Sequence, residues 1–428
     1  MTIFLHSPFA DVKAAGDASA FAECTADFSA LAALGKKGAK CRVSVQNEAQ
    51  AEAAARAFFH GAYRVNREGV RALHGQPIFE ARESLCDFGG AALCLQSESD
   101  LTQAAQRGLA FARCEAYART LGNLPNNFLH AAELAQYARD LAEARGLSCR
   151  VLGEAELRAL GCGGILAVNQ GSAEEAKLVA LEHGAPGDEP PLALVGKGVM
   201  FDAGGYHLKD LRGMDGMKLD MCGAACMLEL MEYAALTRSG RRLLAVLPLV
   251  ENVISPRAVK MGDVLTTLSG QTVEVYNTDA EGRLILCDAL TYAQRLGAKT
   301  VIDLATLTYG CQTALGDEIG GYFSTSDELA LRFEQRARQG GDAFWRLPLA
   351  DCYRKALQWS DCADLANYAP GKGGAASLAA CFLEAFIEPG TQWLHLDVVG
   401  PSVRRSETET ECKGARGAGM AALAGALQ

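Results

Sequence analysis

The sequence predicts an α/β fold, with a small N-terminal α/β domain and a larger C-terminal α/β domain whose mainly parallel central sheet is flanked by helices. Past residue 127, helical patterns alternate with short apolar runs, which is typical of parallel sheets covered by helices. The chain has 428 residues, of which 49% are hydrophobic and 21% charged, the composition of a globular protein with more than one core. No fixed-period repeat is visible, which excludes solenoids and propellers.

The first domain is predicted to span residues 1–98, where short apolar runs mix with helical stretches such as Glu48–His60. Residues 99–126 are predicted to form a connecting helix and turn. Apolar positions over Leu101–Leu121 fit one long amphipathic helix, which Gly122 and the turn-forming Asn123 would end. The second domain is then expected over residues 127–428.

Regular elements of the second domain follow from their periodicity. Helices are predicted at Ala131–Arg145 and Glu154–Leu160. The strands of the sheet are predicted at the apolar runs Gly164–Val168, Leu178–Leu181, Leu192–Val195 and Thr300–Leu304.

Composition restricts the class of protein further. The formal net charge of −10 disfavours attraction to nucleic acid or to anionic membranes. The chain has no basic leader before a long apolar stretch and no long apolar span, which predicts a cytoplasmic protein without membrane segments. The fifteen cysteines are odd in number and scattered, so we expect reduced, mostly buried thiols. Cys222 and Cys226 lie four apart on an expected helix but lack a second ligand pair with zinc-site spacing.

Two segments carry the residues that could perform chemistry, because sites in such sheets lie at the carboxyl ends of strands. The first follows Leu192–Val195 and contains Lys197, Asp202, Gly204, Gly205, Lys209 and Asp220. It lacks the third glycine of a dinucleotide-binding fingerprint. Its glycine pair is expected to let the backbone approach a ligand closely.

The second segment, Asn277–Leu284, follows the strand-like Thr272–Tyr276. In it Asp279, Glu281 and Arg283 alternate, and in an extended stretch their side chains would point the same way. Such alternation usually marks a solvated face, but here glycine and apolar residues flank it and predict burial.

A shared site for the four carboxylates of the two segments implies bound metal, because burying them together without cations would cost many kcal/mol. Oxygen ligands suit Mg²⁺ and Mn²⁺, and a neutral amine ligand adds affinity for Zn²⁺. None of the seven histidines has the paired spacing of zinc proteases, and His207 is predicted to be a loop residue that packs or hydrogen-bonds beside Lys209. No nucleophile elbow occurs, so metal-activated water is the expected nucleophile.

The motifs NTDAEGRL (Asn277–Leu284), VGKGVMFDAGG (Val195–Gly205) and MKLDM (Met217–Met221) closely resemble the leucyl aminopeptidase, or cytosol aminopeptidase, family. The short N-terminal domain and FWRLPL (Phe344–Leu349) resemble its peptidase B branch. The resemblance implies a dinuclear metallo-aminopeptidase, with residues 127–428 as the catalytic domain and two divalent ions, Mn²⁺, Zn²⁺ or Mg²⁺, in each subunit. It also implies a homohexamer that acts on short peptides.

The resemblance assigns a role to each site residue. One set would hold the more exchangeable metal: Asp202, Asp279 and Glu281. Another would hold the tighter metal: Lys197, Asp202, Asp220 and Glu281. A water or hydroxide between the metals would be the nucleophile. Lys209 would polarise the scissile carbonyl, and Arg283 would hold a bicarbonate ion that accepts the proton of the water. Because only a neutral amine binds metal, the site is expected to lower the pKa of Lys197 strongly.

The sequence departs from the family pattern at three places near these motifs, Met200, Cys222 and Tyr309. Tyr309 stands where the family has glycine and is assigned, with Thr306 and Leu307, to the substrate pocket, which its phenol could narrow. Two other functions stay open at this point. One is a DNA-binding architectural protein with vestigial or secondary peptidase activity, which the acidic composition disfavours. The other is a two-metal amidase acting on non-peptide substrates.

Overall fold

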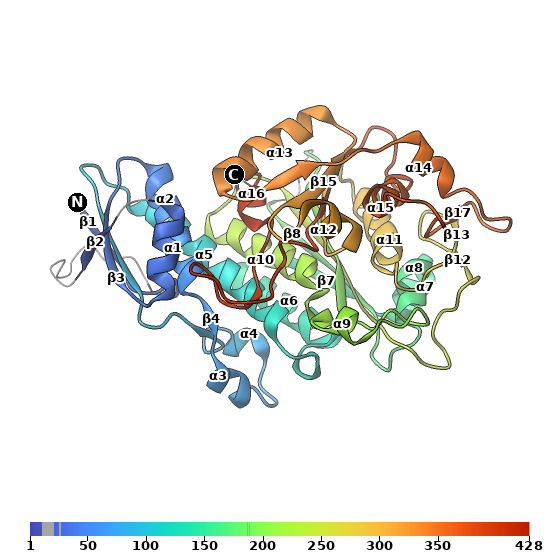
Figure 1. Cartoon of the computed structure of the whole chain (residues 1–428), viewed down its shortest axis with the longest axis horizontal. Helices are drawn as coiled ribbons and strands as arrows, with labels where there is room; N and C mark the ends of the chain where they lie inside the picture. Colours follow the sequence, from blue (N-terminus) through green and yellow to red (C-terminus); the bar gives the residue numbers. More distant parts are fainter. Residues whose placement is uncertain (11–20, 25–26, 186, 188, 428) are drawn as a thin grey trace. The chain divides into compact units, whose positions relative to one another are not determined.

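The structure is a computed structural model that describes residues 1–10, 21–24, 27–185, 187 and 189–427 (Figure 1). Contacts between residues divide the chain into two units. Unit 1 comprises Met1–Asn123, Leu236–Arg238 and Arg404–Gly417, and unit 2 comprises Leu124–Ala235, Ser239–Val403 and Ala418–Gln428. Each unit is therefore assembled from stretches that are far apart in the sequence.

Unit 1 contains a four-stranded sheet in the order β1-β6-β3-β2, with β1 antiparallel to β6 and the other pairs parallel. These strands are β1 Thr2–Leu5, β2 Ala22–Cys24, β3 Lys40–Ser44 and β6 Ala92–Gln96. The remaining elements of the unit are α1 Phe28–Lys36, α2 Glu48–Ala62, β4 Arg64–Val65, α3 Arg67–Ala72, α4 Ile78–Ala81, β5 Cys86–Asp87 and α5 Thr102–Asn123.

Helices α2 and α5 confirm the two helices predicted before residue 127. The side chain of Asn47 caps α2 by accepting a hydrogen bond from the Gln50 amide. The amphipathic description of α5 is wrong for its second half, because every residue of Cys114–Gly122 is buried. A helix that is buried on all sides loses the polar stripe by which an amphipathic helix is recognised.

Unit 2 is built on a nine-stranded sheet in the order β16-β15-β18-β14-β9-β11-β8-β7, with β10 paired to β11. Its central strands β18, β14, β9, β11 and β10 run parallel, whereas β8 and β7 add antiparallel strands at one edge. The mainly parallel sheet predicted from the sequence is thereby confirmed. The strands are β7 Ser148–Leu152, β8 Lys177–His183, β9 Leu192–Gly196, β10 Gly198–Asp202, β11 Leu243–Asn252, β14 Thr300–Ala305, β15 Gly320–Ser324, β16 Phe344–Arg346 and β18 Gln392–Asp397.

Helices and short strands surround this sheet. The α-helices are α6 Ala131–Arg145, α7 Glu154–Leu160, α8 Gly163–Asn169, α9 Leu211–Met214, α10 Cys222–Leu236, α11 Gly282–Arg295, α12 Tyr309–Leu315, α13 Asp327–Gly340, α14 Asp351–Ala356, α15 Ala375–Glu384 and α16 Met420–Ala424. The short segments are η2 Asn126–Phe128, η3 Met217–Leu219, β12 Val264–Thr266, β13 Thr272–Glu274 and β17 Leu365–Ala366. The strands β19 Val403–Arg404 and β20 Gly414–Ala415 pair with each other in a separate two-stranded sheet, and β20 belongs to unit 1. Helices α6 and α7 have the bounds that the sequence predicts.

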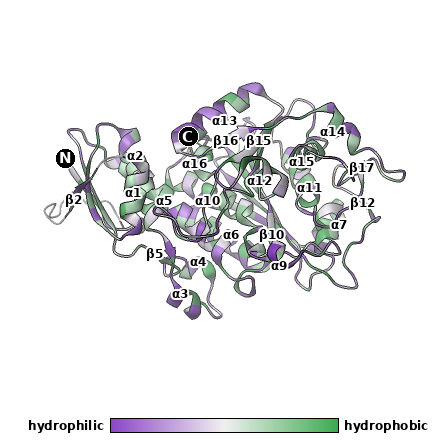
Figure 2. Cartoon of the chain, in the orientation of Figure 1, coloured by the Kyte–Doolittle hydropathy of each residue, from purple (hydrophilic) through white to green (hydrophobic). Residues whose placement is uncertain are grey.

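Both faces of the sheet are covered. On β11, Leu244 and Val246 belong to the same hydrophobic core as residues of α11, while Leu243, Ala245 and Leu247, whose side chains point to the other face, are buried as well. Outer helices keep one polar side, as the mixed colours of α13 show in Figure 2. This double coverage explains why the central strands read as continuous apolar runs.

All fifteen cysteines are free thiols, and most are buried, as predicted. Cys222 and Cys226 lie on α10 and are buried. Among the described residues, no helix combines the length and the hydrophobicity needed to cross a bilayer.

The prediction of a strand at Gly164–Val168 is wrong, because these residues form helix α8. The carboxylate of the buried Asp288 on α11 accepts a hydrogen bond from the Ile165 amide at 3.0 Å, which satisfies an N–H group at the start of α8. A Cβ added to Gly164 would lie 2.1 Å from the carbonyl oxygen of Leu284. An apolar run of this length does not distinguish a buried strand from a short buried helix.

This close approach predicts that Gly164→Ala destabilises the protein, although alanine favours helix by about 1 kcal/mol over glycine. Overpacking against the backbone of α11 should lower the free energy of unfolding by about 1–3 kcal/mol, seen as lower thermal and urea midpoints. Gly373→Ala is the matched control, because open space surrounds that position, and it should change the stability by less than about 0.5 kcal/mol. Equal midpoints for the two variants would contradict the packing argument.

Candidate active site

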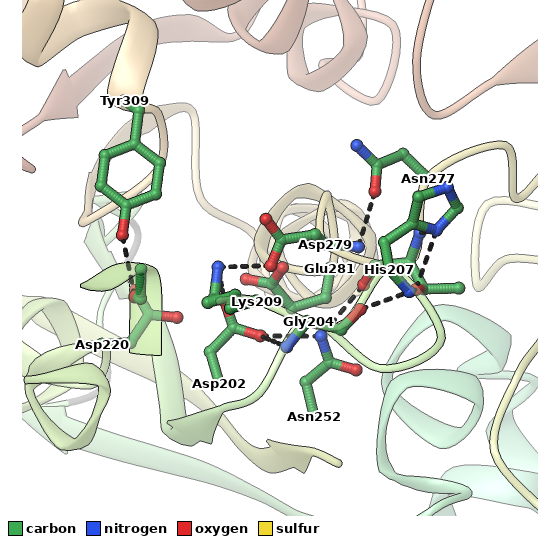
Figure 3. Close-up of polar contacts among 12 residues, drawn as sticks. Asp202, Gly204, His207, Lys209, Asp220, Asn252, Asn277, Asp279, Glu281 and Tyr309 are labelled. Atoms are coloured by element: carbon green, nitrogen blue, oxygen red, sulfur yellow. Dashed lines mark hydrogen bonds and ion pairs between the residues drawn. The ribbon is translucent and has the colours of Figure 1, made fainter. Parts of the chain in front are cut away.

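The predicted site residues meet in unit 2, at the carboxyl ends of neighbouring parallel strands (Figure 3). Lys197 directly follows β9, Asp202 ends β10, and Thr306 and Leu307 follow β14. Asp220 follows η3, and Glu281 precedes α11. Strand ends therefore supply part of the site and loops the rest.

Lys197 lies at the centre of one half of the cluster. Its buried Nζ is 2.8 Å from both oxygens of Asp220 and 2.9 Å from Oε1 of Glu281. It also donates a hydrogen bond of 2.8 Å to the carbonyl oxygen of Thr306. The Thr306 hydroxyl in turn donates to Oδ1 of Asp220 at 2.7 Å.

Lys209 holds the other half together. Its Nζ lies 2.8 Å from Oδ2 of Asp202 and contacts Oδ1 of Asp279. Oxygens of Asp202, Asp279 and Glu281 lie within 4.8 Å of one another, a grouping that could hold a metal ion. This grouping is the set of three carboxylates that the resemblance assigns to the more exchangeable metal.

Backbone conformation brings these groups together. Gly204 and Gly205 have positive φ angles of 87° and 61°, as their role in a tight turn requires. A Cβ on Gly204 would lie 2.3 Å from the carbonyl oxygen of His207, so another residue would disrupt the turn between Asp202 and Lys209. The close approach made here is to the backbone of His207, and the predicted approach of this turn to a ligand stays a prediction.

The expectation that Asp279, Glu281 and Arg283 share an extended stretch is wrong. Asp279 lies in a turn, Glu281 has helical dihedral angles as the N-cap of α11, and Arg283 lies in the first turn of that helix. Gly282 allows this sharp entry into the helix, since a Cβ there would lie 2.6 Å from Cε of Lys197. Helical geometry therefore separates Arg283 from the carboxylates that precede it.

His207 lies outside the carboxylate cluster and is a hydrogen-bonding loop residue, as predicted. Its Nδ1 accepts from the Thr278 amide at 3.1 Å, and its own amide donates to the Thr278 hydroxyl at 2.8 Å. The Thr278 hydroxyl donates to the carbonyl oxygen of Gly204 at 2.7 Å. These bonds connect the turn that carries Asp202 to the turn that carries Asp279.

Three further residues support the site and are missing from the sequence analysis. Asn252, at the end of β11, donates through Nδ2 to Oδ1 of Asp202 at 2.8 Å and to the carbonyl oxygen of Thr278 at 3.0 Å. The rule that found Lys197, a polar residue after an apolar strand, also applies to Asn252.

Asn367 follows the two-residue strand β17 and donates to the carbonyl oxygen of Asn277 at 2.7 Å. Asp397, at the end of β18, accepts hydrogen bonds from the Leu307 amide at 3.2 Å and the Thr308 hydroxyl at 2.6 Å. It thereby fixes the segment that follows β14. Asp397 ends the apolar run Trp393–Leu396 and so follows the same rule, but no local sequence signal marks Asn367.

Burial and mutual repulsion change the pKa values of the four carboxylates. Burial, with the charge of Glu281 next in importance, raises the pKa of Asp202 to about 7 and that of Asp279 to about 6. Burial also raises the pKa of Asp220 to about 7, although Lys197 opposes the shift. Burial alone would raise the pKa of Glu281, but the two lysines lower it overall.

The surrounding side chains by themselves raise the pKa of Lys197, so the lowered pKa expected for a metal-bound amine stays a prediction. Burial by itself would lower the pKa of Lys197, but attraction to Asp220 and Glu281 outweighs burial and raises it. The carboxylates therefore keep the amine protonated, and only the charge of a metal ion could displace its proton.

The donor set fits divalent cations. Two ammonium groups lie against four carboxylates, Asp202, Asp220, Asp279 and Glu281. Oδ2 of Asp220 and Oδ1 of Asp279 are buried and, among the described residues, accept no well-directed hydrogen bond although each faces an ammonium group. Buried oxygens without hydrogen bonds are suited to metal ligation.

Arg283 presents a donor suited to an anion. Its buried guanidinium donates through Nη1 to the carbonyl oxygen of Asn367 at 2.8 Å, while Nε has no partner among the described residues. Burial lowers the pKa of Arg283 to about 10. A small anion beside it would satisfy the free donor.

The fold and the site define an α/β protein with a carboxylate-rich centre of the kind that binds divalent metal ions. The model of the cytosol aminopeptidase family, catalytic domain, matches residues 116–424. The chain belongs to this family, which confirms the resemblance found in the sequence.

Proteins of similar sequence support the same family assignment. The chain is 44% identical over 315 residues to a probable cytosol aminopeptidase of Exiguobacterium sibiricum, covering 74% of this chain and 66% of the relative. It is 48% identical over 308 residues to one of Nitratidesulfovibrio vulgaris (71% and 60%) and 43% identical over 322 residues to one of Bacillus subtilis (74% and 63%). The chain thus spans less than two thirds of the length of these relatives.

A solved structure is similar over more of the chain. The bottromycin maturation enzyme BotP in complex with Mn superposes with a TM-score of 0.82 and 31% sequence identity, covering 94% of this chain and 87% of that one. A second structure of the bottromycin maturation enzyme BotP superposes with a TM-score of 0.79 and 31% sequence identity, covering 94% of this chain and 86% of that one. These neighbours confirm the mixed α/β architecture.

The position of Asn252 predicts that it supports metal binding through Asp202. Asn252→Ala removes a donor to the carboxylate and leaves the Thr278 carbonyl without it, so the affinity for Mn²⁺ should fall about 10- to 100-fold. Calorimetric titration of metal-free protein measures this. Asn127→Ala, at an exposed position outside the site, is the control and should bind Mn²⁺ like the unmodified protein. An unchanged affinity in Asn252→Ala would contradict the supporting role.

Proposed function

We propose that this protein is an aminopeptidase that hydrolyses the first peptide bond of short peptides with the aid of two divalent metal ions. The observation that carries the proposal is the buried cluster of four carboxylates and two lysines at the strand ends of unit 2. Membership of the cytosol aminopeptidase family and the similarity to a protein solved with Mn support it.

The ligands are proposed as two overlapping sets. Asp202, Asp279 and Glu281 would hold one ion, and their oxygens already lie within 4.8 Å of one another. Lys197, Asp202, Asp220 and Glu281 would hold the other, with Lys197 losing its proton on binding. When bound, Mn²⁺, Zn²⁺ or Mg²⁺ would supply Lewis acidity and make water a nucleophile near neutral pH.

The side chains of the chain itself would bind and orient the peptide. Asp220 would receive the free α-ammonium group of the substrate, since its Oδ2 accepts no directed hydrogen bond from the described residues. Thr306 and Leu307, whose segment is fixed by Asp397, would line the pocket for the first residue together with Tyr309.

Lys209 would stabilise charge that develops on the scissile carbonyl oxygen. Its side chain is largely buried and reaches the cluster from the turn after β10, so its ammonium group is held in place before the reaction. Burial alone would lower the pKa of Lys209, but attraction to Asp202 and Glu281 outweighs it and keeps the group protonated.

Arg283 would hold a bicarbonate ion through its free Nε. Bicarbonate would serve as the base that accepts the proton of the attacking water. On the same family likeness, we propose that the protein acts in the cytoplasm as a homohexamer.

The first test of the proposal uses short peptides with free and acetylated N-termini. Free dipeptides should be cleaved. The acetylated forms should not be cleaved, because they cannot present an ammonium group to Asp220. Chelation of the metal should abolish activity until Mn²⁺ is restored. Product release followed by chromatography measures all three. Efficient cleavage of acetylated peptides would favour the amidase alternative, and full turnover after complete metal removal would rule out the two-metal mechanism.

A second test separates Lys209 from the metal ligands. Lys209→Ala should reduce kcat about 100- to 1000-fold, equivalent to about 2.7–4 kcal/mol, because the oxyanion loses its donor. It should keep its metal content, because removing the ammonium group frees oxygens of Asp202 and Asp279. Asp279→Ala should instead lose metal.

Metal per subunit, measured by mass spectrometry beside kcat for both variants, distinguishes the two roles. Loss of metal in Lys209→Ala, or turnover close to that of the unmodified protein, would show that the role assigned to Lys209 is wrong.

A further inference from the structure

Tyr309 forms part of the wall of the carboxylate cluster. It is the first residue of α12, and its ring lies with its centroid 5.7 Å from Nζ of Lys209. Figure 3 shows the phenol extending from α12 towards the side of the cluster where Asp220 lies. The residue is 44% exposed, so one side of the ring borders open space.

The charges of the cluster act on the Tyr309 phenol. Burial raises the pKa of Tyr309, and the charges of Asp220 and Asp279 raise it further although Lys209 opposes them. The phenol therefore lies within electrostatic range of both halves of the cluster. A group that enters the site beside Lys209 meets this aromatic surface.

A hydrogen bond fixes the ring in this position. The Tyr309 hydroxyl donates to the carbonyl oxygen of Gly213 in α9 at 3.2 Å. The segment between Gly204 and Gly213, which carries Lys209, is thus held at one end by Thr278 through His207 and at the other by Tyr309. Rotation of the ring away from the cluster would break the bond to Gly213, so the space that the phenol occupies is not freely available to a substrate.

We propose that Tyr309 determines specificity by restricting the first residue of the peptide to small side chains such as those of glycine, alanine and serine. The inference rests on the proposed aminopeptidase function and adds the class of substrate. A tyrosine side chain covers about 150–250 Å² of surface, comparable to the bulky side chain that it would exclude. Each excess methylene that meets a fixed wall costs about 10- to 200-fold in relative kcat/KM.

The test compares kcat/KM for Ala-Gly, Leu-Gly and Phe-Gly with the metal-loaded full-length protein. The unmodified protein should prefer Ala-Gly at least about tenfold. Tyr309→Ala should bring the three values within about threefold of one another, mainly by improving the bulky substrates. Tyr309→Phe keeps the ring but loses the bond to Gly213, so its preference for alanine should lie between those of the unmodified protein and Tyr309→Ala. Asn127→Ala, at an exposed position outside the site, is the control and should behave as the unmodified protein.

A binding measurement accompanies the kinetics. Calorimetry with free alanine and leucine should show that Tyr309→Ala gains affinity for leucine while its affinity for alanine stays within about threefold, independently of turnover. Thermal midpoints establish that the variants are folded.

Three results would overturn the inference. Equal cleavage of Ala-Gly and Leu-Gly by the unmodified protein would refute it and leave the aminopeptidase function intact. The inference would also be refuted if Tyr309→Ala lowered kcat equally for all three substrates and left the ratios of their kcat/KM values unchanged. Tyr309 would then only support Lys209. Failure of the unmodified protein to cleave any free dipeptide would instead refute the proposed function, and this inference with it.

Discussion

Four carboxylates share one small buried volume at the strand ends of unit 2, and their mutual repulsion is the constraint that the rest of the site must satisfy. A buried ion without a partner costs several kcal/mol, so each carboxylate here needs a cation or a donor. Lys197 and Lys209 provide two ammonium groups, and each of them contacts two of the acids. The remaining negative charge makes this part of the fold receptive to divalent cations.

The same arrangement couples metal binding to protonation. The carboxylates raise the pKa of Lys197, so this lysine can become a ligand only by exchanging a proton for a metal ion. Lys209 lies on a segment held by Thr278, which bonds to His207, and by Tyr309, which bonds to Gly213. The contacts of Lys209 with Asp202 and Asp279 compete with a cation for the same oxygens. One lysine is therefore suited to ligation and the other to stabilising charge on a substrate.

Hydrogen bonds between distant parts of the chain keep the acids close despite their repulsion. Asn252 connects the end of β11 to Asp202 and to Thr278, and Asn367 connects β17 to Asn277 and Arg283. These amides are neutral, so they satisfy polar groups without adding charge to the cluster. Because Asn252 and Asn367 bond to the segments that carry the acids, a substitution of either asparagine can alter the site without removing any proposed ligand.

The sequence by itself determined the fold class, the helices at Glu48–Ala62 and Ala131–Arg145, and the two segments that carry the acids, because hydrophobic period and short motifs are local properties. It failed at Gly164–Val168, where an apolar run fits a strand or a helix equally, and only the close approach of α11 decides for the helix.

It also failed for the segment that follows Asp279, because the entry into α11 depends on space beside Lys197, a residue more than eighty positions earlier. The protonation of Lys197, the support from Asn367 and the position of the Tyr309 ring were likewise decided by the tertiary structure alone. Each depends on the distance between side chains that the chain brings together only after folding, and electrostatic shifts and hydrogen bonds are set by that distance.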